Sequence, residues 1–345
     1  AEPAVAHHRT DFVGFGRTMI ADPELPDKLA AGRPEDVIHC IHCNRCLGER
    51  KTWDIVTSLG GVRCSVNATT GRERESAITP AKKAKKVLVI GGGPAGMEAA
   101  RVAALRGHRV TLFEERRELG GTLPVAAVPP FKEPINGLTE YLARQLKKQG
   151  VDIKLGVEAS LKIVEDARPD VVIIATGAAP FTPDIPGIDR AKVVEAESVL
   201  AGKADVGNKV VVIGAESVGC ETAEFLADKG KKVTVTRRGS EIATNTNWTL
   251  RRALLIRLEQ KGVVALTGVN YQKLTDRGLV LTTKEGKTQL IEADTVVIAA
   301  GARPRSGLYD ALKDKVAEVY RIGDCVKPRD IMEAISEAYD VARSI

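Results

Sequence analysis

The 345-residue sequence has few aromatic residues, no apolar run long enough to cross a membrane and no large excess of charge of one sign. The longest apolar runs, at 171–176 and 295–300, have the length of a strand. The net charge of +6 is spread among many acidic residues, and no basic stripe interleaved with aromatic side chains follows the chain. We therefore expect neither a nucleic-acid partner nor a membrane partner.

Cysteine is also scarce, with 6 residues, and no N-terminal stretch resembles a secretory signal peptide. The chain is far longer than the small secreted scaffolds that depend on disulfides, so we expect a cytoplasmic protein. Cys220 and Cys325 each lie in a nucleotide-binding segment without a neighbouring cysteine. We expect both to be small, buried apolar residues.

Glycine, alanine and valine are abundant, which predicts an α/β protein, and one strand–glycine loop–helix unit stands out. The apolar run 87–90 predicts a buried strand that leads through the glycine loop into a helix. Gly91 permits a tight turn, Gly93 lets the backbone approach a pyrophosphate, and Gly96 lets the helix pack against the strand. Glu114, at the end of the next strand, can accept hydrogen bonds from ribose hydroxyls. This ordered unit predicts a dinucleotide site.

The unit recurs from residue 210, with Gly214 and Gly219 as its first and last glycines. Glu216 replaces the middle glycine, where its side chain would clash with or repel a pyrophosphate unless it swings into solvent. Arg237 and Arg238 stand where an acid would bind ribose, which suits a 2′-phosphate and favours NADPH over NADH. The alternative is that these arginines form only a solvated strand end.

Four further cysteines precede the first glycine loop, spaced C-x2-C-x2-C and then separated by seventeen residues from the last: Cys40, Cys43, Cys46 and Cys64. A short loop of cysteines can ligate three irons of a cubane while a distant fourth closes the cage, which favours a 4Fe–4S cluster. Zinc is an alternative because His39 and His42 lie nearby, and a structural or disulfide role is another.

The order of cysteine cluster, first glycine loop and Gly323–Asp324 resembles the iron–sulfur flavoprotein branch of the old yellow enzyme superfamily. Members include 2,4-dienoyl-CoA reductase, 2-enoate reductase and trimethylamine dehydrogenase. The resemblance implies an N-terminal TIM barrel that holds FMN and substrate, and a 4Fe–4S cluster beside it. It also implies two nested, glutathione-reductase-like Rossmann domains that bind FAD and NAD(P)H.

Within this chain, the resemblance implies four parts: a remnant of the barrel's C-terminal end over 1–35, a cluster segment and linker over 36–80, an FAD domain over 81–205 and 300–345, and an NAD(P) domain over 206–299. Segment 11–17 is similar to a strand that enters a phosphate-binding loop, yet nothing before it supplies a sheet. We therefore expect a missing upstream portion.

The residues that match the family's sites fall into four groups. Gly16 and Arg17 match the FMN-phosphate loop, and the four closely spaced cysteines match the cluster ligands. The FAD positions are matched by Gly91, Gly93, Gly96, Glu114, Gly121, Thr176, Gly177, Gly323 and Asp324. The NAD(P) positions are matched by Gly214, Gly219, Arg237 and Arg238.

Three departures from the family pattern limit what the resemblance implies. The cysteine triplet is more similar to that of the amine dehydrogenases, and the stretch before Cys64 is longer than usual. Nearly the whole barrel is absent, so neither the substrate nor the catalytic residues can be carried over.

The leading hypothesis is an oxidoreductase that passes electrons from NAD(P)H through FAD and a 4Fe–4S cluster to FMN, for reduction of an activated C=C bond of enoate or dienoyl-CoA type. One alternative is an amine dehydrogenase that passes electrons outward to an electron-transfer flavoprotein. A second is a diaphorase-like electron-transfer subunit, and a third is a nucleotide-sensing module without enzyme activity. The expected partners are a small-molecule substrate and a second copy of the chain, a separately encoded barrel or an electron-transfer protein.

Overall fold

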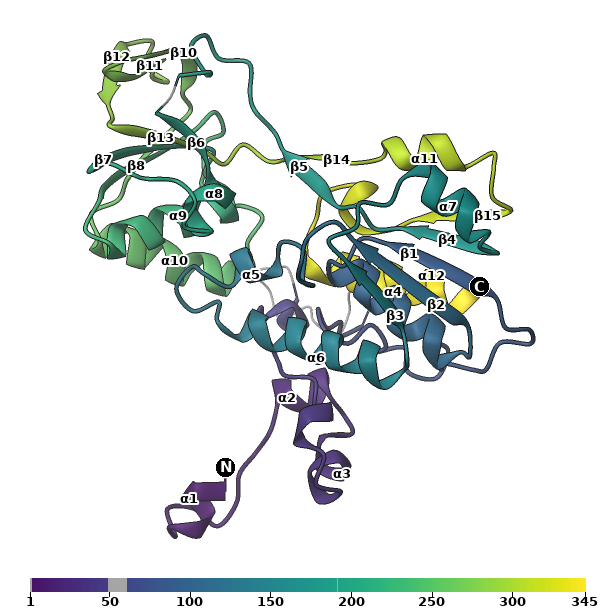
Figure 1. The fold of residues 1–345 in the computed structure, drawn as a ribbon. Coiled ribbons are helices and arrows are strands. Elements are labelled where there is room, and N and C mark those ends of the chain that lie inside the picture. The colour runs from purple at the N-terminus through teal and green to yellow at the C-terminus, as the bar shows by residue number, and fades with distance from the viewer. Residues whose placement is uncertain (1, 49–60, 191) are drawn as a thin grey trace.

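The computed structural model describes residues 2–48, 61–190 and 192–345 and contains two parallel Rossmann-like sheets with helices packed on them (Figure 1). Residues 49–60 of the expected cluster segment lie outside the described residues. The first sheet runs in the order β15 (Glu318–Arg321), β4 (Val171–Ile174), β1 (Lys86–Ile90), β2 (Arg109–Glu114) and β3 (Asp152–Leu155). Strand β4, and β1 after its exposed Lys86, are apolar and buried because helices cover both faces of the sheet. This sheet and its helices form the first lobe.

The end of the chain returns to this first lobe. Strand β15 pairs in parallel with β4, and α12 (Ile331–Ser344) packs against α4 (Pro94–Leu105). The second module is therefore inserted within the first, as the sequence predicts. The other helical elements of the lobe are α5 (Leu123–Ala126), α6 (Pro134–Lys148), α7 (Leu161–Ala167), α11 (Gly307–Leu312) and η3 (Gly323–Cys325).

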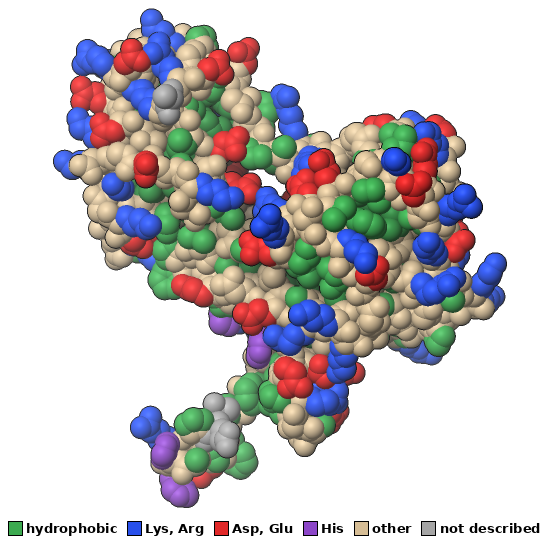
Figure 2. All heavy atoms as spheres, viewed as in Figure 1, with side chains coloured by type: hydrophobic (Ala, Val, Ile, Leu, Met, Phe, Trp, Pro, Cys, Tyr) green, Lys and Arg blue, Asp and Glu red, His purple; other side chains and the backbone are tan. Residues whose placement is uncertain are grey.

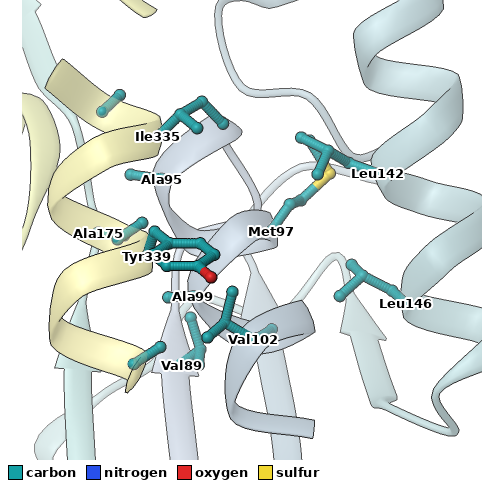
Figure 3. Packing of buried hydrophobic residues seen from close by; sticks show 14 of the residues in the cluster. Val89, Ala95, Met97, Ala99, Val102, Leu142, Leu146, Ala175, Ile335 and Tyr339 are labelled. Carbon is teal, nitrogen blue, oxygen red and sulfur yellow. The ribbon is translucent and has the colours of Figure 1, made fainter. Parts of the chain in front are cut away.

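Helix α4 lies between α12 and α6 at the centre of the first lobe (Figure 3). Tyr339 of α12 lies against α4 beside the small side chain of Ala99, and Met97 points toward Leu142 of α6. Met97 is fully buried, and burial of such a side chain contributes about 1.5–3 kcal/mol. This packing fixes the helix whose N-terminus carries the first glycine loop.

The second lobe is built on a sheet ordered β6 (Val193–Glu195), β13 (Thr295–Ile298), β7 (Lys209–Ile213), β8 (Lys232–Arg237) and β9 (Val264–Thr267). Its helices are α8 (Ala196–Leu200), α9 (Ser217–Asp228) and α10 (Trp248–Gln260), and a three-stranded antiparallel sheet joins it: β10 (Asn270–Thr275), β11 (Gly278–Thr282) and β12 (Thr288–Glu292). Because β6 pairs with β13, this lobe uses residues that precede position 206.

Two crossing segments join the lobes. Strand β5 (Ala178–Pro180) carries the chain from the first lobe to the second, and β14 (Ala302–Pro304) returns it. The two pair in antiparallel fashion, as Figure 1 shows between the lobes. The link between the lobes is therefore a two-stranded ribbon.

The N-terminal residues form short helices that extend from the first lobe: α1 (Glu2–Ala6), α2 (Arg17–Ala21), α3 (Leu25–Ala30), η1 (Pro34–Asp36) and η2 (Arg45–Leu47). The strand expected within segment 11–17 does not form, and Phe12 is 89% exposed. A strand needs a neighbour for its backbone hydrogen bonds, and none of the described strands pairs with this segment.

Basic and acidic side chains are interspersed over both lobes on the face that Figure 2 shows. Among the described helices, none combines the length and the apolarity that a transmembrane segment requires.

Candidate nucleotide and cluster sites

The first glycine loop joins β1 to α4 at the carboxyl edge of the first sheet. Gly91 has a φ of 110°, which favours glycine, and a Cβ there would overlap the carbonyl oxygen of Ala175. A Cβ on Gly96 would overlap the carbonyl oxygen of Gly91. Close packing of strand, loop and helix therefore requires both glycines.

Gly93 has a different environment. The nearest atom to an added Cβ would be the Cα of Gly121, at 3.9 Å, and the backbone of Gly93 is extended. The protein itself does not demand glycine at this position. The open space at the N-terminus of α4 suits a pyrophosphate, which the free backbone amides and the helix dipole would attract.

Glu114 lies at the end of β2, beside this loop, and is 5% exposed. Its carboxylate accepts hydrogen bonds from the backbone amides of Gly92, at 2.6 Å, and Arg116, at 2.7 Å. Each oxygen keeps lone-pair capacity for a ribose hydroxyl. The structure thus holds the acid in the place where the motif requires it.

Thr176 and Gly177 follow β4 at the same edge of the sheet. The Thr176 hydroxyl donates to the carbonyl oxygen of Arg305 at 2.6 Å, and Gly177 has a φ of 68°. Arg305 also donates two hydrogen bonds to Glu115, at 2.6 and 2.9 Å. These hydrogen bonds from Arg305 lower the pKa of Glu115, and their effect outweighs that of burial, which raises it.

Gly323 and Asp324 reach this edge from the end of the chain. A Cβ on Gly323 would lie 3.0 Å from the Cβ of Ala95, so η3 contacts the start of α4. Burial raises the pKa of Asp324, whose Oδ1 accepts from the Arg329 amide at 3.0 Å. The expected FAD residues thus gather at one sheet edge, and the open backbone and fixed acid there fit a dinucleotide.

The second glycine loop repeats the backbone geometry of the first. Gly214 has a φ of 103°, and a Cβ there would overlap the carbonyl oxygen of Ala299. A Cβ on Gly219 would overlap the carbonyl oxygen of Gly214. The two lobes therefore share one loop construction.

Glu216 does not swing into solvent, because its carboxylate forms an ion pair with Arg237. It also accepts hydrogen bonds from the Thr244 hydroxyl, at 2.7 Å, and the Asn245 amide, at 3.1 Å. The Arg237 guanidinium, expected to bind a 2′-phosphate, is thus paired with a carboxylate of the same chain, and its role in nucleotide binding stays a prediction. The carboxylate is turned away from the loop backbone toward the end of β8.

Arg238, the other expected 2′-phosphate residue, is exposed. Its guanidinium lies 5.1 Å from the ring centroid of Tyr271, which is within cation–π range. The Tyr271 hydroxyl lies 3.2 Å from the hydroxyl of Thr236 in β8. These contacts order the strand end without pairing Arg238 with a carboxylate.

The cysteine segment (residues 37–48 and 61–68) lies at the edge of the first core. Cys40, Cys43 and Cys64 pack against that core, and all four cysteines are partly exposed. Burial raises the pKa of the Cys46 and Cys64 thiols, and the nearby Cys43 and Cys40 raise both further. Cys40 and Cys43 therefore lie near both Cys46 and Cys64.

Across the described residues, no three histidine, cysteine or acidic side chains converge on the position of a single metal ion. In a cubane each thiolate binds a different iron, so its ligands need not meet at one point. Cysteine thiolates are soft ligands that suit iron–sulfur clusters, so the four cysteines fit such a cluster.

The cysteine segment contacts both lobes through its backbone and side chains. The Asn44 amide group donates to the Thr249 hydroxyl at 3.1 Å, and the Asn247 amide group donates to the Gly48 carbonyl at 2.8 Å. Both partners lie at the start of α10 in the second lobe. Arg45 forms an ion pair with Asp330, which precedes α12 in the first lobe.

The expected FMN-phosphate residues lie beside this segment. Arg17 begins α2 and donates to the side-chain oxygen of Asn44, and Gly16 has no atom within 4 Å of an added Cβ. The structure therefore places Arg17 next to the cysteines. Cys220 and Cys325 are fully buried, as predicted, and burial raises the pKa of Cys220 to about 12.

A family model described as pyridine nucleotide-disulphide oxidoreductase matches residues 85–342. The chain belongs to this family. It is 41% identical to an NADH oxidase of Thermoanaerobacter brockii, with 100% of this chain and 53% of the relative covered. It is 39% identical to a cinnamate reductase of Clostridium sporogenes, with 99% of this chain and 51% of the relative covered.

A solved complex of a 2-naphthoyl-CoA reductase with 2-naphthoyl-CoA superposes with a TM-score of 0.94 at 38% identity, over 100% of this chain and 52% of that one. The chain thus spans about half the length of these relatives. It corresponds to the C-terminal FAD- and NAD(P)-binding part of old yellow enzyme-like iron–sulfur flavoproteins, so the resemblance is confirmed. The family is one of oxidoreductases, and its matched fold binds FAD and NAD(P).

Sequence reasoning missed the segment 241–245, which binds Glu216, and Asn247, which joins α10 to the cysteine segment. Asn247 had a local signal, because an asparagine before a helical run is a common N-cap. Segment 241–245 had none, because its contact with the glycine loop depends on how the chain turns after β8.

Proposed function

We propose that this chain is the electron-input part of an NAD(P)H-dependent iron–sulfur flavoprotein. Electrons would pass from NAD(P)H through FAD and a 4Fe–4S cluster to FMN, for reduction of an activated C=C bond. The residues proposed to hold these groups are those that match the family's sites, with the four clustered cysteines as cluster ligands. FMN and substrate would be held mainly by a barrel, in the same or a separate chain.

The observation that carries this proposal is the position of the cysteine segment. It packs against the core of the first lobe, which includes residues of α4, and is hydrogen-bonded to the start of α10 in the second lobe. FAD can accept two electrons as a hydride and release them one at a time, which suits a cluster that carries one electron. Four cysteines beside two nucleotide-binding lobes favour a role in electron transfer over a role in nucleotide binding alone.

The test is an anaerobic titration of the purified chain with NADH and with NADPH, together with iron and labile-sulfide analysis. We expect the flavin absorbance to bleach on addition of the reduced nucleotide, and about four irons per chain if one cubane is bound. Cys43→Ser should lose the iron and keep the flavin. Cys220→Ser, at a buried cysteine distant from the cluster in sequence, should keep both. A protein that holds neither flavin nor iron would contradict the proposal.

A second candidate is an amine dehydrogenase, in which electrons leave a reduced FMN through the cluster. The close cysteine triplet and the replacement of a glycine by Glu216 favour it. It predicts that NADH and NADPH reduce the flavin slowly or not at all. Rapid oxidation of either nucleotide with an artificial electron acceptor would contradict this candidate.

A further inference from the structure

The second lobe contains an acid–base pair that neither the glycine motif nor the strand-end motif predicts. Glu216 occupies the middle glycine position, and its side chain is 36% exposed. Arg237 ends β8, with its side chain 23% exposed. Their ion pair brings a carboxylate from the glycine loop to the strand end that dinucleotide folds use for adenosine ribose.

Three further contacts hold the carboxylate in this direction. The Thr244 hydroxyl and the Asn245 amide donate to its two oxygens, and the Arg237 guanidinium also donates to the Thr244 hydroxyl at 3.2 Å. The Asn245 side-chain oxygen accepts from the Ser217 amide at 3.0 Å, which ties segment 241–245 to the first turn of α9. The orientation of Glu216 is thus set by several bonds from different parts of the lobe.

This arrangement reverses the charge that a nucleotide would meet at the strand end. A 2′-phosphate would carry about two negative charges toward a carboxylate, and the arginine behind that carboxylate is already neutralised. A ribose with a free 2′-hydroxyl would instead donate a hydrogen bond to Oε2 of the same carboxylate, which accepts from the Asn245 amide and keeps a second lone pair. The geometry therefore discriminates between the two nucleotides by charge as well as by hydrogen bonding.

We propose that Glu216 is the ribose-recognising acid of the second lobe, that Arg237 positions it, and that the site accordingly prefers NADH over NADPH. The inference rests on the proposed function, because it assumes that this lobe binds the nicotinamide nucleotide. In dinucleotide folds the ribose-binding acid usually ends the second strand, which is β8 here. In this chain a residue of the glycine loop would take that role.

The test is the equilibrium binding of NAD⁺ and NADP⁺ to the full chain by calorimetry, which requires no hydride transfer. We expect wild type to bind NAD⁺ at least about tenfold more tightly than NADP⁺, a difference of about 1.4 kcal/mol. Glu216→Gln should lose most of this preference. NADP⁺ binding should strengthen about tenfold or more, because Arg237 loses its carboxylate partner while it keeps two neutral acceptors, the backbone carbonyl of Glu241 and the hydroxyl of Thr244. Adding Arg237→Gln to that variant should abolish the gain.

Arg237→Gln alone should leave NADP⁺ binding weak, so the two substitutions should not be additive. The matched control is Glu241→Gln, which removes one negative charge from the same segment. The Glu241 side chain is 63% exposed and pairs with Arg251 instead of Arg237. Its nucleotide preference should match that of wild type.

Each outcome separates this inference from the function on which it rests. If wild type binds neither nucleotide, the proposed function fails. If wild type binds NADP⁺ as tightly as NAD⁺ or more tightly, only the assignment of Glu216 is overturned, and loss of that binding in Arg238→Gln would identify the phosphate ligand. The wild-type comparison decides the matter even if a Glu216 variant does not fold.

Discussion

At the scale of single residues, the three motif glycines of the first lobe serve two purposes. Gly91 and Gly96 are required by contacts within the protein, whereas Gly93 has room for a side chain. A sequence motif treats these positions alike. The structure separates the glycines that the fold needs from the one that a ligand needs.

Gly93→Ala and Gly96→Ala should therefore behave differently. We expect Gly93→Ala to lower FAD affinity at least about tenfold while costing about 1 kcal/mol of stability or less, since Gly93 is the N-cap of α4. Gly96→Ala should cost about 2–4 kcal/mol, because its Cβ would overlap the Gly91 carbonyl oxygen. Denaturant unfolding and flavin content per chain measure the two effects.

The control for these substitutions is Gly137→Ala in α6, where no atom lies within 4 Å of an added Cβ. Removal of a glycine from a helix interior should stabilise the protein by about 0.5–1 kcal/mol. Equal loss of stability in Gly93→Ala and Gly96→Ala would contradict the distinction between them.

At the scale of elements, the N-terminus of α10 is an anchoring point as well as a helix end. The Asn247 side-chain oxygen accepts from the Thr249 amide at 3.1 Å, which caps the helix. Its amide group donates to the carbonyl oxygens of Asn44, at 3.3 Å, and Gly48, at 2.8 Å. One side chain thus caps the second lobe's helix and binds the cysteine segment.

Asn247→Ala should cost more than loss of an ordinary cap. A lost N-cap costs about 0.5–2 kcal/mol, and loss of the two hydrogen bonds to the cysteine segment adds about 0.5–1.5 kcal/mol each. The Asn44 carbonyl oxygen still accepts from the Leu47 amide, at 3.0 Å. Ser160→Ala is the matched control, because the Ser160 side chain caps α7 and, among the described residues, accepts from the Ile163 amide of the same helix alone. We expect thermal unfolding to show a larger loss for Asn247→Ala. Equal losses would mean that the contacts to the cysteine segment contribute nothing.

At the scale of the whole molecule, side-chain contacts hold three separate parts of the chain together. Lys132 of the first lobe pairs with Glu221 of the second at 2.7 Å. Asp36, in the N-terminal segment, accepts from Gln145 of α6 at 3.1 Å and pairs with Lys148 of the same helix. The Asp36 side chain is 9% exposed, so this contact is shielded from solvent better than an ordinary surface pair.

The Asp36 contact predicts a pH dependence. The Lys148 hydrogen bond is the main cause that lowers the pKa of Asp36 below its ordinary value of 3.8 in the folded protein, against the effect of burial. The contribution of Asp36 to stability is therefore present above pH 3.8 and is lost as the pH falls through the lower, folded-state pKa. Asp36→Asn should cost about 1–2 kcal/mol at neutral pH, and its difference from wild type should shrink in acid.

Unfolding at several pH values measures this effect, with Asp152→Asn as the control. Asp152 forms an exposed pair with Lys154 in the same strand, so its loss should cost little at neutral pH. A constant difference between Asp36→Asn and wild type across the acid range would contradict the predicted linkage.

The sequence by itself determined the two strand–glycine loop–helix units, the return of the chain end to the first lobe and the burial of Cys220 and Cys325. These features depend on neighbours along the chain: apolar runs, glycine positions and helix periodicity. Tertiary structure alone decided that Glu216 pairs with Arg237 and that Asn247 binds a segment about two hundred residues earlier in the chain. The pairing of such distant side chains depends on sheet register and on the paths of the loops. Neither can be predicted from the residues that are neighbours along the chain.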